Sequence, residues 1–183
     1  MSSGRKVDAT SWFREPGRGR YARHERERRF LVRPSVPTGL ATRLIEDRYL
    51  EGTSLRLRRV TSDGRAVHKL TQKVRTSHDD PAEVLITNLY LSAEEHQRLA
   101  ALPGHVIAKT RTVVATTTHE FVVDDFQGQL QGLRLAEVEV DDLAAPLDLP
   151  DWVGAEVTHD DRYSGGSLAA LDPGGLDALL DPR

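Results

Sequence analysis

The chain lacks cysteine, so disulfide bonds and thiolate metal sites are excluded. No apolar run is long enough to span a bilayer, and the N-terminus lacks a signal-peptide core. We therefore expect a cytoplasmic protein with no membrane partner. Aromatic residues are only 5% of the chain, the net charge is −3, and no basic or aromatic track suits a nucleic acid. No nucleic-acid partner is expected.

The composition is that of a folded chain, with 38% hydrophobic and 29% charged residues over 183 positions. This length suits one domain with a proper core. Residues 1–22 are polar and without periodicity, which predicts a flexible N-terminal tail. Residues 23–183 are then the single domain. The sequence leaves open whether the protein is a monomer or a homodimer.

Acidic side chains alternate at strand spacing in two distant stretches. Within His24–Val32, Glu25, Glu27 and Arg29 fall on one face of a strand. Within Ala136–Val140, Glu137 and Glu139 share a face, with valine on the other. If the two strands met, they would supply carboxylate oxygens, the hard ligands that Mg²⁺ and Mn²⁺ prefer.

Basic side chains alternate in the same way on strands between these two. The stretches are 54–60, 66–75 and 106–114, and their aligned cations are Arg56, Arg58, Lys73, Lys109 and Arg111. Lys69 shares the face of Lys73 but lies near the end of the hairpin. The pattern there predicts a solvent-exposed side chain at least as well as one that binds a ligand. The 62–65 segment predicts the hairpin turn itself, because its Asp-Gly pair tolerates positive φ.

Further strands are predicted at 82–91 and 120–126, and residues 48–50 also read as extended. A capping box at Ser92 opens a helix that ends before Pro103–Gly104. Short helices are predicted at 150–154 and within 167–180. The fold class is therefore α+β, mainly β: a closed eight-stranded antiparallel barrel with a few peripheral helices. Because acids lie on the first and last strands and bases on the middle ones, we expect a charged, water-filled lumen.

Such a lumen has a definite chemistry. Inward Arg and Lys side chains bind a polyanion, and guanidinium groups match phosphate oxygens. Carboxylates opposite would repel that anion unless divalent cations lay between them. A metal there polarises a phosphoryl oxygen and lowers the pKa of a bound water. The arrangement points to hydrolysis of a short phosphate chain such as a triphosphate.

The ordered set of motifs resembles the CYTH superfamily, also called triphosphate tunnel metalloenzymes. Glu25-Arg26-Glu27-Arg28-Arg29 looks like the Glu-x-Glu-x-Lys signature of that superfamily. The similarity continues through 48–50, 55–58, 70–73, 109–111, 123–128, 132–133, 136–139, 156–158 and 162–164. It implies an eight-stranded tunnel that hydrolyses triphosphates with Mg²⁺ or Mn²⁺, its substrate being a small triphosphate.

The resemblance also implies roles by position. Metal ligands would be Glu25, Glu27, Glu137 and Glu139; substrate-binding residues would be Arg56, Arg58, Lys73, Lys109, Arg111 and Arg162; catalytic residues would be Glu25, Glu27, Arg29 and Asp124. Arg162 and Tyr163 would close one mouth of the tunnel, or Tyr163 would pack under the barrel. His78 and His159 lie in loops and are read as solvated.

Two departures from the superfamily pattern keep alternatives open. The signature lysine is Arg29, and the strand 83–90 has only Glu83 where the superfamily usually has more than one glutamate. A non-catalytic polyphosphate- or nucleotide-binding module is one alternative. An adenylyl cyclase acting on ATP is another, although its purine pocket would have only Tyr49, Tyr90 and Trp152 as aromatic candidates.

Overall fold

The structure, a computed structural model, describes residues 15–36, 39, 41–76 and 81–180. The strands are β1 (Arg23–Val32), β2 (Ala41–Leu50), β3 (Leu55–Ser62), β4 (Arg65–Arg75), β5 (Glu83–Leu91), β6 (Gly104–Ala115), β7 (Glu120–Phe126), β8 (Arg134–Glu139) and β9 (Val153–Glu156). The helices are α1 (Ala93–Ala100), α2 (Gly165–Ala169) and α3 (Asp177–Leu180), with 3₁₀ turns η2 (Gly128–Leu130) and η3 (Asp161–Tyr163).

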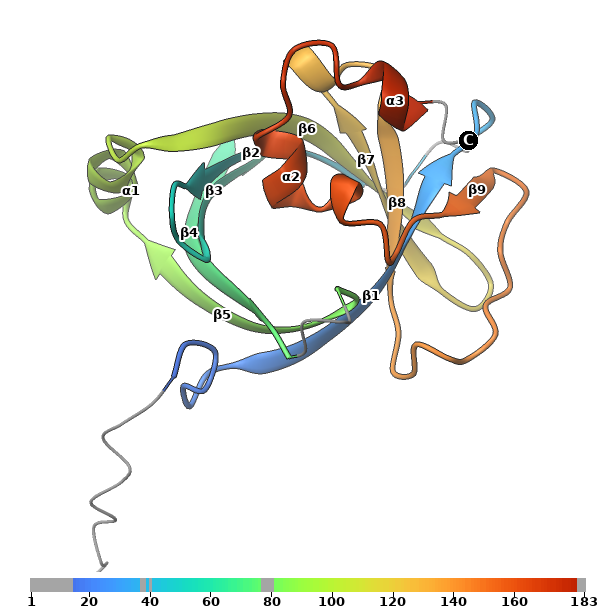
Figure 1. The fold of residues 1–183 in the computed structure, drawn as a ribbon, viewed down its shortest axis with the longest axis horizontal. Helices are drawn as coiled ribbons and strands as arrows, with labels where there is room; N and C mark the ends of the chain where they lie inside the picture. Colours follow the sequence, from blue (N-terminus) through green and yellow to red (C-terminus); the bar gives the residue numbers. More distant parts are fainter. Residues whose placement is uncertain (1–14, 37–38, 40, 77–80, 181–183) are drawn as a thin grey trace, which may run out of the picture.

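The strands form one antiparallel sheet that closes on itself. Their order is β5-β4-β3-β2-β6-β7-β8-β1-β9, and an additional β5–β1 pairing joins the ends of the first eight. β1 pairs with β5 through its first half and with β8 through its second half. Figure 1 looks along the resulting ring of strands. The predicted eight-stranded closed barrel is confirmed, with β9 added beside β1.

Two local signals in the sequence act as predicted. The β3–β4 hairpin turns at Asp63 and Gly64, whose φ angles are 49° and 73°. At the start of α1, the Glu95 amide donates to the Ser92 hydroxyl at 3.2 Å, and the Ser92 amide donates to the Glu95 carboxylate at 2.7 Å. The capping box is complete, so the helix begins where its orphan amide groups are satisfied.

Two stretches differ from the sequence prediction. The second strand runs from Ala41 to Leu50 rather than only through 48–50. Each face of this strand mixes charged and apolar residues, so hydrophobic alternation does not mark it. Residues 153–156 form β9 rather than a helix, because Val153 pairs with Val32 at the edge of the sheet. Tertiary pairing there outweighs local propensity.

Two apolar clusters lie on either side of the barrel wall. Outside the wall, β9 and the preceding loop cover a cluster that includes Phe30, Phe121 and Trp152. Inside one end, the C-terminal segment packs Tyr163, Leu168 and Leu179 against side chains of β6, β7 and β8. Figure 1 shows α2 lying across this opening of the ring. The C-terminal segment thus plugs one end of the barrel and leaves the middle of the lumen to polar side chains.

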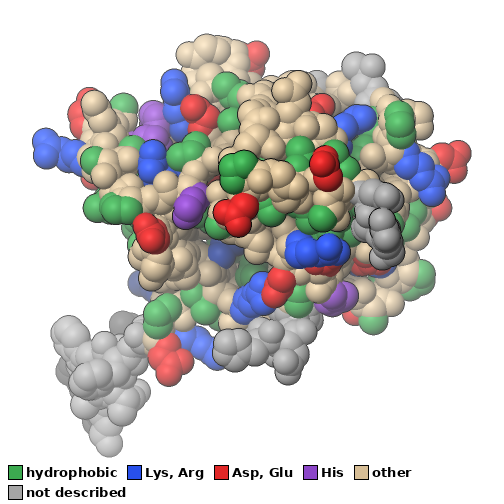
Figure 2. Space-filling view, turned by 45° about the horizontal axis from the view of Figure 1, so that its top comes forward, with side chains coloured by type: hydrophobic (Ala, Val, Ile, Leu, Met, Phe, Trp, Pro, Cys, Tyr) green, Lys and Arg blue, Asp and Glu red, His purple; other side chains and the backbone are tan. Residues whose placement is uncertain are grey.

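The outer surface has no single dominant chemistry on the face that Figure 2 presents, where acidic, basic and hydrophobic side chains are interspersed. None of the helices in the described ranges has the length and apolar character needed to cross a bilayer. Residues 15–22, which the sequence assigns to a tail, lie partly against the barrel: the Gly17 amide donates to the Gln72 side chain at 3.1 Å.

Candidate active site

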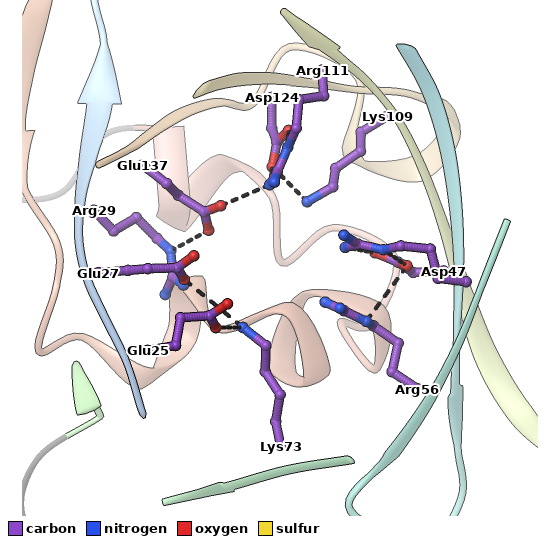
Figure 3. Close-up of polar contacts among 11 residues, drawn as sticks. Glu25, Glu27, Arg29, Asp47, Arg56, Lys73, Lys109, Arg111, Asp124 and Glu137 are labelled. Carbon is purple, nitrogen blue, oxygen red and sulfur yellow. Dashed lines mark hydrogen bonds and ion pairs between the residues drawn. The ribbon is translucent and has the colours of Figure 1, made fainter. Parts of the chain in front are cut away.

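A ring of alternating acidic and basic side chains lines the middle of the barrel. Figure 3 shows these side chains pointing from the strands toward a common central space. Their placement follows from register: residues paired across neighbouring strands project to the same face, so one alternating pattern continues around the barrel. The ring consists of Glu25, Glu27, Arg29, Asp47, Arg56, Arg58, Lys73, Lys109, Arg111, Asp124 and Glu137.

The acidic side of the ring comes from β1 and β8, as predicted. Glu27 pairs in register with Glu139, and Arg29 with Glu137. The Lys73 ammonium donates to Glu25 and lies 3.8 Å from Glu27. Over the described residues, the ion pair of Glu27 is this long one to Lys73, and Glu27 also lies near the carboxylates of Glu25 and Glu137.

On the β6–β8 side, each carboxylate is shared between cations. Arg29 Nε donates to Glu137 at 3.0 Å, and Arg111 donates to the same carboxylate at 2.7 Å. Arg111 also donates to Asp124 through Nε at 2.6 Å and Nη2 at 2.7 Å. The Lys109 ammonium is bonded to the second oxygen of Asp124. Arg111 thus links two acids from neighbouring strands and is fixed by both.

Asp47, on β2, is a ring member that the sequence analysis missed. Its side chain is fully buried and accepts two hydrogen bonds from Arg58, from Nε at 2.6 Å and from Nη2 at 2.7 Å. Arg56 Nε lies 3.6 Å from the same carboxylate and is buried without a hydrogen-bond partner. Side chains two positions apart on a strand share a face, so Asp47 lies on the same face as Tyr49. A predicted strand that reached back to Ala41 would have identified it.

The electrostatic surroundings move the pKa values of the lumen acids in opposite directions. Burial raises the pKa of Glu27, and the Glu137 and Glu25 carboxylates add to that effect against the opposing charge of Lys73. For Glu137, burial is outweighed by Arg29 and Arg111, which hold the pKa of that carboxyl well below its usual value. For Asp47, burial is likewise outweighed by Arg58 and Arg56, and the pKa falls to about 2.

The donor set fits a hard divalent cation better than any softer metal. All possible metal ligands among the ring side chains are carboxylates, and Glu27 is a half-buried acid whose pKa is raised, chiefly by desolvation. A cation beside Glu27 would relieve that cost. Over the ranges the structure describes, no cluster of three or more His, Asp or Glu side chains is already arranged to ligate a metal. The lumen cations occupy the carboxylates instead.

Not every residue singled out in the sequence joins the ring. Glu139 lies opposite Glu27 in register but is exposed at the end of β8. Arg162 is 55% exposed and bonds to Asp160 at 2.6 Å, outside the ring. Tyr163 packs in the plug, where its hydroxyl donates to the Leu179 carbonyl. His159 lies in a turn, whereas His78 falls outside the described residues.

The strand β5 contributes no carboxylate to the lumen. Its only acid, Glu83, is paired with Arg26 on the outer face of the barrel at 2.6 Å. Registers with β1 and β4 place Val84, Ile86 and Asn88 on the lumen side. The strand that has few acids in the sequence therefore places none in the lumen. The carboxylates of the lumen come from β1, β2, β7 and β8.

A cavity of about 210 Å³ lies between the ring and the C-terminal plug. Glu27, Arg29 and Lys73 form its lumen side, and Asp160 and Asp161 lie toward the plug. Space for a small anion therefore adjoins the acids of β1 and the cations that pair with them.

Comparisons with known proteins agree with this geometry. No protein-family model matches the chain. A segment of 63 residues is 41% identical to an inorganic triphosphatase of Acetivibrio thermocellus; it is 34% of this chain and spans only 40% of that relative's length. The crystal structure of the inorganic triphosphatase NE1496 matches with a TM-score of 0.58 and 28% identity, over 82% of this chain and 97% of that one. The PH1819 protein from Pyrococcus horikoshii shares the fold, with a TM-score of 0.51 and 15% identity over 65% of this chain and 80% of that one.

The fold and the site define a closed antiparallel barrel with an ion-paired lumen. In sequence, part of the chain is similar to one inorganic triphosphatase, and in fold most of the chain is similar to another.

Proposed function

We propose that this protein is a divalent-metal-dependent hydrolase that cleaves a phosphoanhydride bond of inorganic triphosphate or a small organic triphosphate inside the barrel. The observation that carries the proposal is the lumen ring, in which cations from β3, β4 and β6 face carboxylates from β1 and β8. The two relatives named as inorganic triphosphatases support the same chemistry and favour the inorganic substrate.

Phosphate binding in this lumen is an exchange of ion pairs. The cations that would hold phosphate oxygens each lie within reach of a carboxylate in the ligand-free ring; they are Arg56, Arg58, Lys73, Lys109 and Arg111. A triphosphate that takes over these donors leaves their carboxylates without partners. Uncompensated buried carboxylates are costly, so phosphate entry raises the affinity of the ring for a cation.

Glu25, Glu27 and Glu137 of the ring, together with Glu139 at the exposed end of β8, are the residues that would hold that cation. We propose that it is Mg²⁺ or Mn²⁺, because the ligand atoms are all carboxylate oxygens. When bound, it supplies Lewis-acid polarisation of a phosphoryl oxygen and a more acidic water.

The chain's own residues provide the remaining steps. Before a ligand enters, Asp47 positions Arg58 and Asp124 positions Arg111, so both guanidinium groups already lie at the lumen. Fixed cations of this kind stabilise the charge that develops on the leaving phosphate. Arg29, at the position of the signature lysine, is positioned by Glu137 beside the acids of β1.

A non-catalytic phosphate-binding module remains the competing function, and the acid-free lumen side of β5 favours it. The module predicts triphosphate binding that yields no released phosphate. The hydrolase predicts metal-dependent turnover.

The deciding experiment measures phosphate release from tripolyphosphate with Mg²⁺ and, separately, Mn²⁺. We expect turnover in the wild type and a loss of at least about a hundredfold in kcat for Glu27→Gln, with binding retained. Glu51→Gln, in an exposed turn, is the matched control and should leave turnover unchanged. Binding without turnover in the wild type would establish the module, and absence of both would reject the lumen as a phosphate site.

A further inference from the structure

The proposed function gives no role to the segment that follows β9, although its Thr158 lies at the site. Thr158 is 4% exposed and lines the cavity of about 210 Å³ beside Arg29. A buried hydroxyl needs hydrogen-bond partners, and those partners show what the side chain holds in place.

The Thr158 hydroxyl joins two groups that are distant in the sequence. It accepts a hydrogen bond from the Arg29 amide at 3.0 Å and donates one to the Glu156 carboxylate at 2.6 Å. The neighbouring Val157 amide donates to the Arg29 carbonyl at 2.8 Å. Residues 157 and 158 therefore hold both backbone polar groups of Arg29.

The direction of these bonds follows from charge and distance. A hydroxyl has one proton to donate. That proton goes to Glu156, because the Arg29 carbonyl is farther from the hydroxyl, at 3.4 Å. Hydrogen bonds from Arg28 and from Thr158 lower the pKa of Glu156, so this side chain is an acceptor at neutral pH. The Thr158 oxygen is thereby left to accept from the Arg29 amide.

Glu156 is itself fixed by a side chain on the outer face of the barrel wall. Arg28 donates to Glu156 through Nε at 2.9 Å and through Nη2 at 2.6 Å. Arg28 also donates through Nη1 to the Ala145 carbonyl at 3.1 Å. Bidentate pairs of this kind fix geometry as well as contribute energy. Arg28, Glu156 and Thr158 thus form a bonded chain that ends on the backbone of Arg29.

This bonded chain determines where the Arg29 side chain lies in the lumen. Because the amide and carbonyl of Arg29 point to residues 157 and 158, Arg29 and Glu137 form a cross-strand pair of the non-hydrogen-bonded type, in which side chains lie closest together. Arg29 Nε accordingly donates to Glu137 at 3.0 Å. A shift of the Arg29 backbone would move its guanidinium away from Glu137 and from the acids of β1.

We infer that Thr158 is a positioning residue for Arg29 in the hydrolysis of the phosphate chain, and that Glu156 and Arg28 act through Thr158. The inference rests on the proposed function of the ring. Small displacements of a group at a reacting centre lower the rate of the chemical step. Loss of the Thr158 hydroxyl should therefore lower turnover, whereas the cations of β3, β4 and β6 still bind the substrate.

The first test is Thr158→Val, which removes the hydroxyl at nearly constant volume. We expect kcat for tripolyphosphate hydrolysis with Mg²⁺ to fall by about fivefold and KM to change by less than about twofold. Thr158→Ser keeps the hydroxyl and should restore kcat to within about twofold of the wild type. Thr116→Val is the matched control, because the Thr116 hydroxyl also accepts from an amide and donates to a carbonyl, both of His119, in the β6–β7 turn. Its kcat should equal that of the wild type.

A double-mutant cycle with Arg29→Gln separates positioning of Arg29 from general destabilisation. If Thr158 acts through Arg29, Thr158→Val should lower kcat by less than about twofold in the Arg29→Gln background. If Thr158→Val does not fold in thermal melts, Glu156→Ala replaces it in the same cycle, with Glu156→Gln as the variant that keeps an acceptor for the Thr158 hydroxyl.

The outcomes distinguish this inference from the proposed function. A loss of kcat that disappears in the Arg29→Gln background and is restored by Thr158→Ser supports the positioning role. An unchanged kcat, an equal loss in both backgrounds, or an equal loss in Thr116→Val overturns that role and leaves the hydrolase in place. A wild-type protein without turnover overturns both.

Discussion

At the scale of single residues, Asp47 organises the basic wall of the lumen. Its fully buried carboxylate bonds to Arg58 and faces Arg56, and among the described residues it is the acid nearest to either guanidinium. Removing one member of a buried charged group costs more than the pair contributes, because the remaining charges stay buried without a partner. We therefore treat Asp47 as a positioning residue for phosphate binding.

Asp47→Asn should destabilise the protein in a pH-dependent manner. The pKa of Asp47 is lowered from 3.8 to about 2, so its stabilising effect is present above pH 4 and is lost as the pH falls toward 2. At neutral pH this corresponds to about 2 kcal/mol of unfolding free energy. Urea denaturation at pH 7 and at pH 3 measures the difference between the variant and the wild type.

The difference should shrink at the lower pH. Asp125→Asn is the matched control, because Asp125 is an acid on β7 that is 60% exposed and faces away from the lumen. A pH-independent difference for Asp47→Asn would contradict the lowered pKa as its cause.

Substitutions at Arg29 test whether turnover depends on the charge or on the shape of the side chain at this position. Arg29→Lys keeps the charge beside Glu137 but loses the guanidinium fork. We expect tripolyphosphate turnover to stay within about threefold of the wild type, and Arg29→Gln to lower kcat by about tenfold or more. Initial rates at saturating substrate separate the two. Equal losses in both variants would show that the fork geometry, rather than the charge, is required.

Much of the ring could be predicted from residues alone, because alternation at period two places charges on one face regardless of the rest of the fold. Glu25, Glu27 and Glu137 were found in this way. Asp47 was not, since its strand mixes Ile45 with charges on the lumen face and gives no apolar pattern. The outward position of Glu83 also needed the register with β1, which no local pattern contains.

At the scale of elements, the contact between β2 and the plug is the tightest constraint on the closed end of the barrel. A Cβ placed on Gly165, at the start of α2, would lie 1.9 Å from the Tyr49 hydroxyl. Gly165 is therefore required for the close approach of α2 to Tyr49. Gly166, one residue on, would place its Cβ 3.9 Å from the nearest atom of the same ring.

Gly165→Ala should destabilise the protein by about 1 to 3 kcal/mol through overpacking, because either α2 or the Tyr49 ring must move. Gly166→Ala is the matched control and should be neutral or slightly stabilising, since alanine favours helix. Thermal melts of the two variants measure the contrast. Equal melting temperatures would show that α2 is not packed against Tyr49 in solution.

Elements with strong local signals were predictable, and elements defined by their partners were not. The capping box at Ser92 and the Asp63–Gly64 turn specify their structures within four residues. β9 depends on the edge of β1, more than a hundred residues earlier, and the sequence around Pro150 predicted a short helix instead. The C-terminal helices were expected, but their role as a plug follows only from the cluster around Tyr163.

At the scale of the whole molecule, a net charge of −3 coexists with a lumen rich in cations. A phosphate chain would therefore be attracted by the lumen cations and not by the charge of the protein as a whole. Its binding should stabilise the whole barrel, because the ring residues come from most of its strands. Ligand at about a hundred times its Kd adds about 2.7 kcal/mol to the unfolding free energy.

Tripolyphosphate without metal should accordingly raise the melting temperature by several degrees, and added sodium chloride should reduce the shift through screening. Sodium sulfate at matched ionic strength controls for general anion effects. A shift no larger than that with sulfate would contradict specific binding of a phosphate chain in the lumen.

The double pairing of β1 has a consequence for how the chain folds during synthesis. β1 is synthesised before the other described strands, yet its second half pairs with β8, and Arg29 and Glu137 are separated by 108 positions. Until that late partner emerges, Arg29 lacks the carboxylate of Glu137, whereas Glu25 can already pair with Lys73 of β4. Such long-range closure is slow, so we expect ring formation to be the final, rate-limiting step of folding rather than collapse of the hairpins.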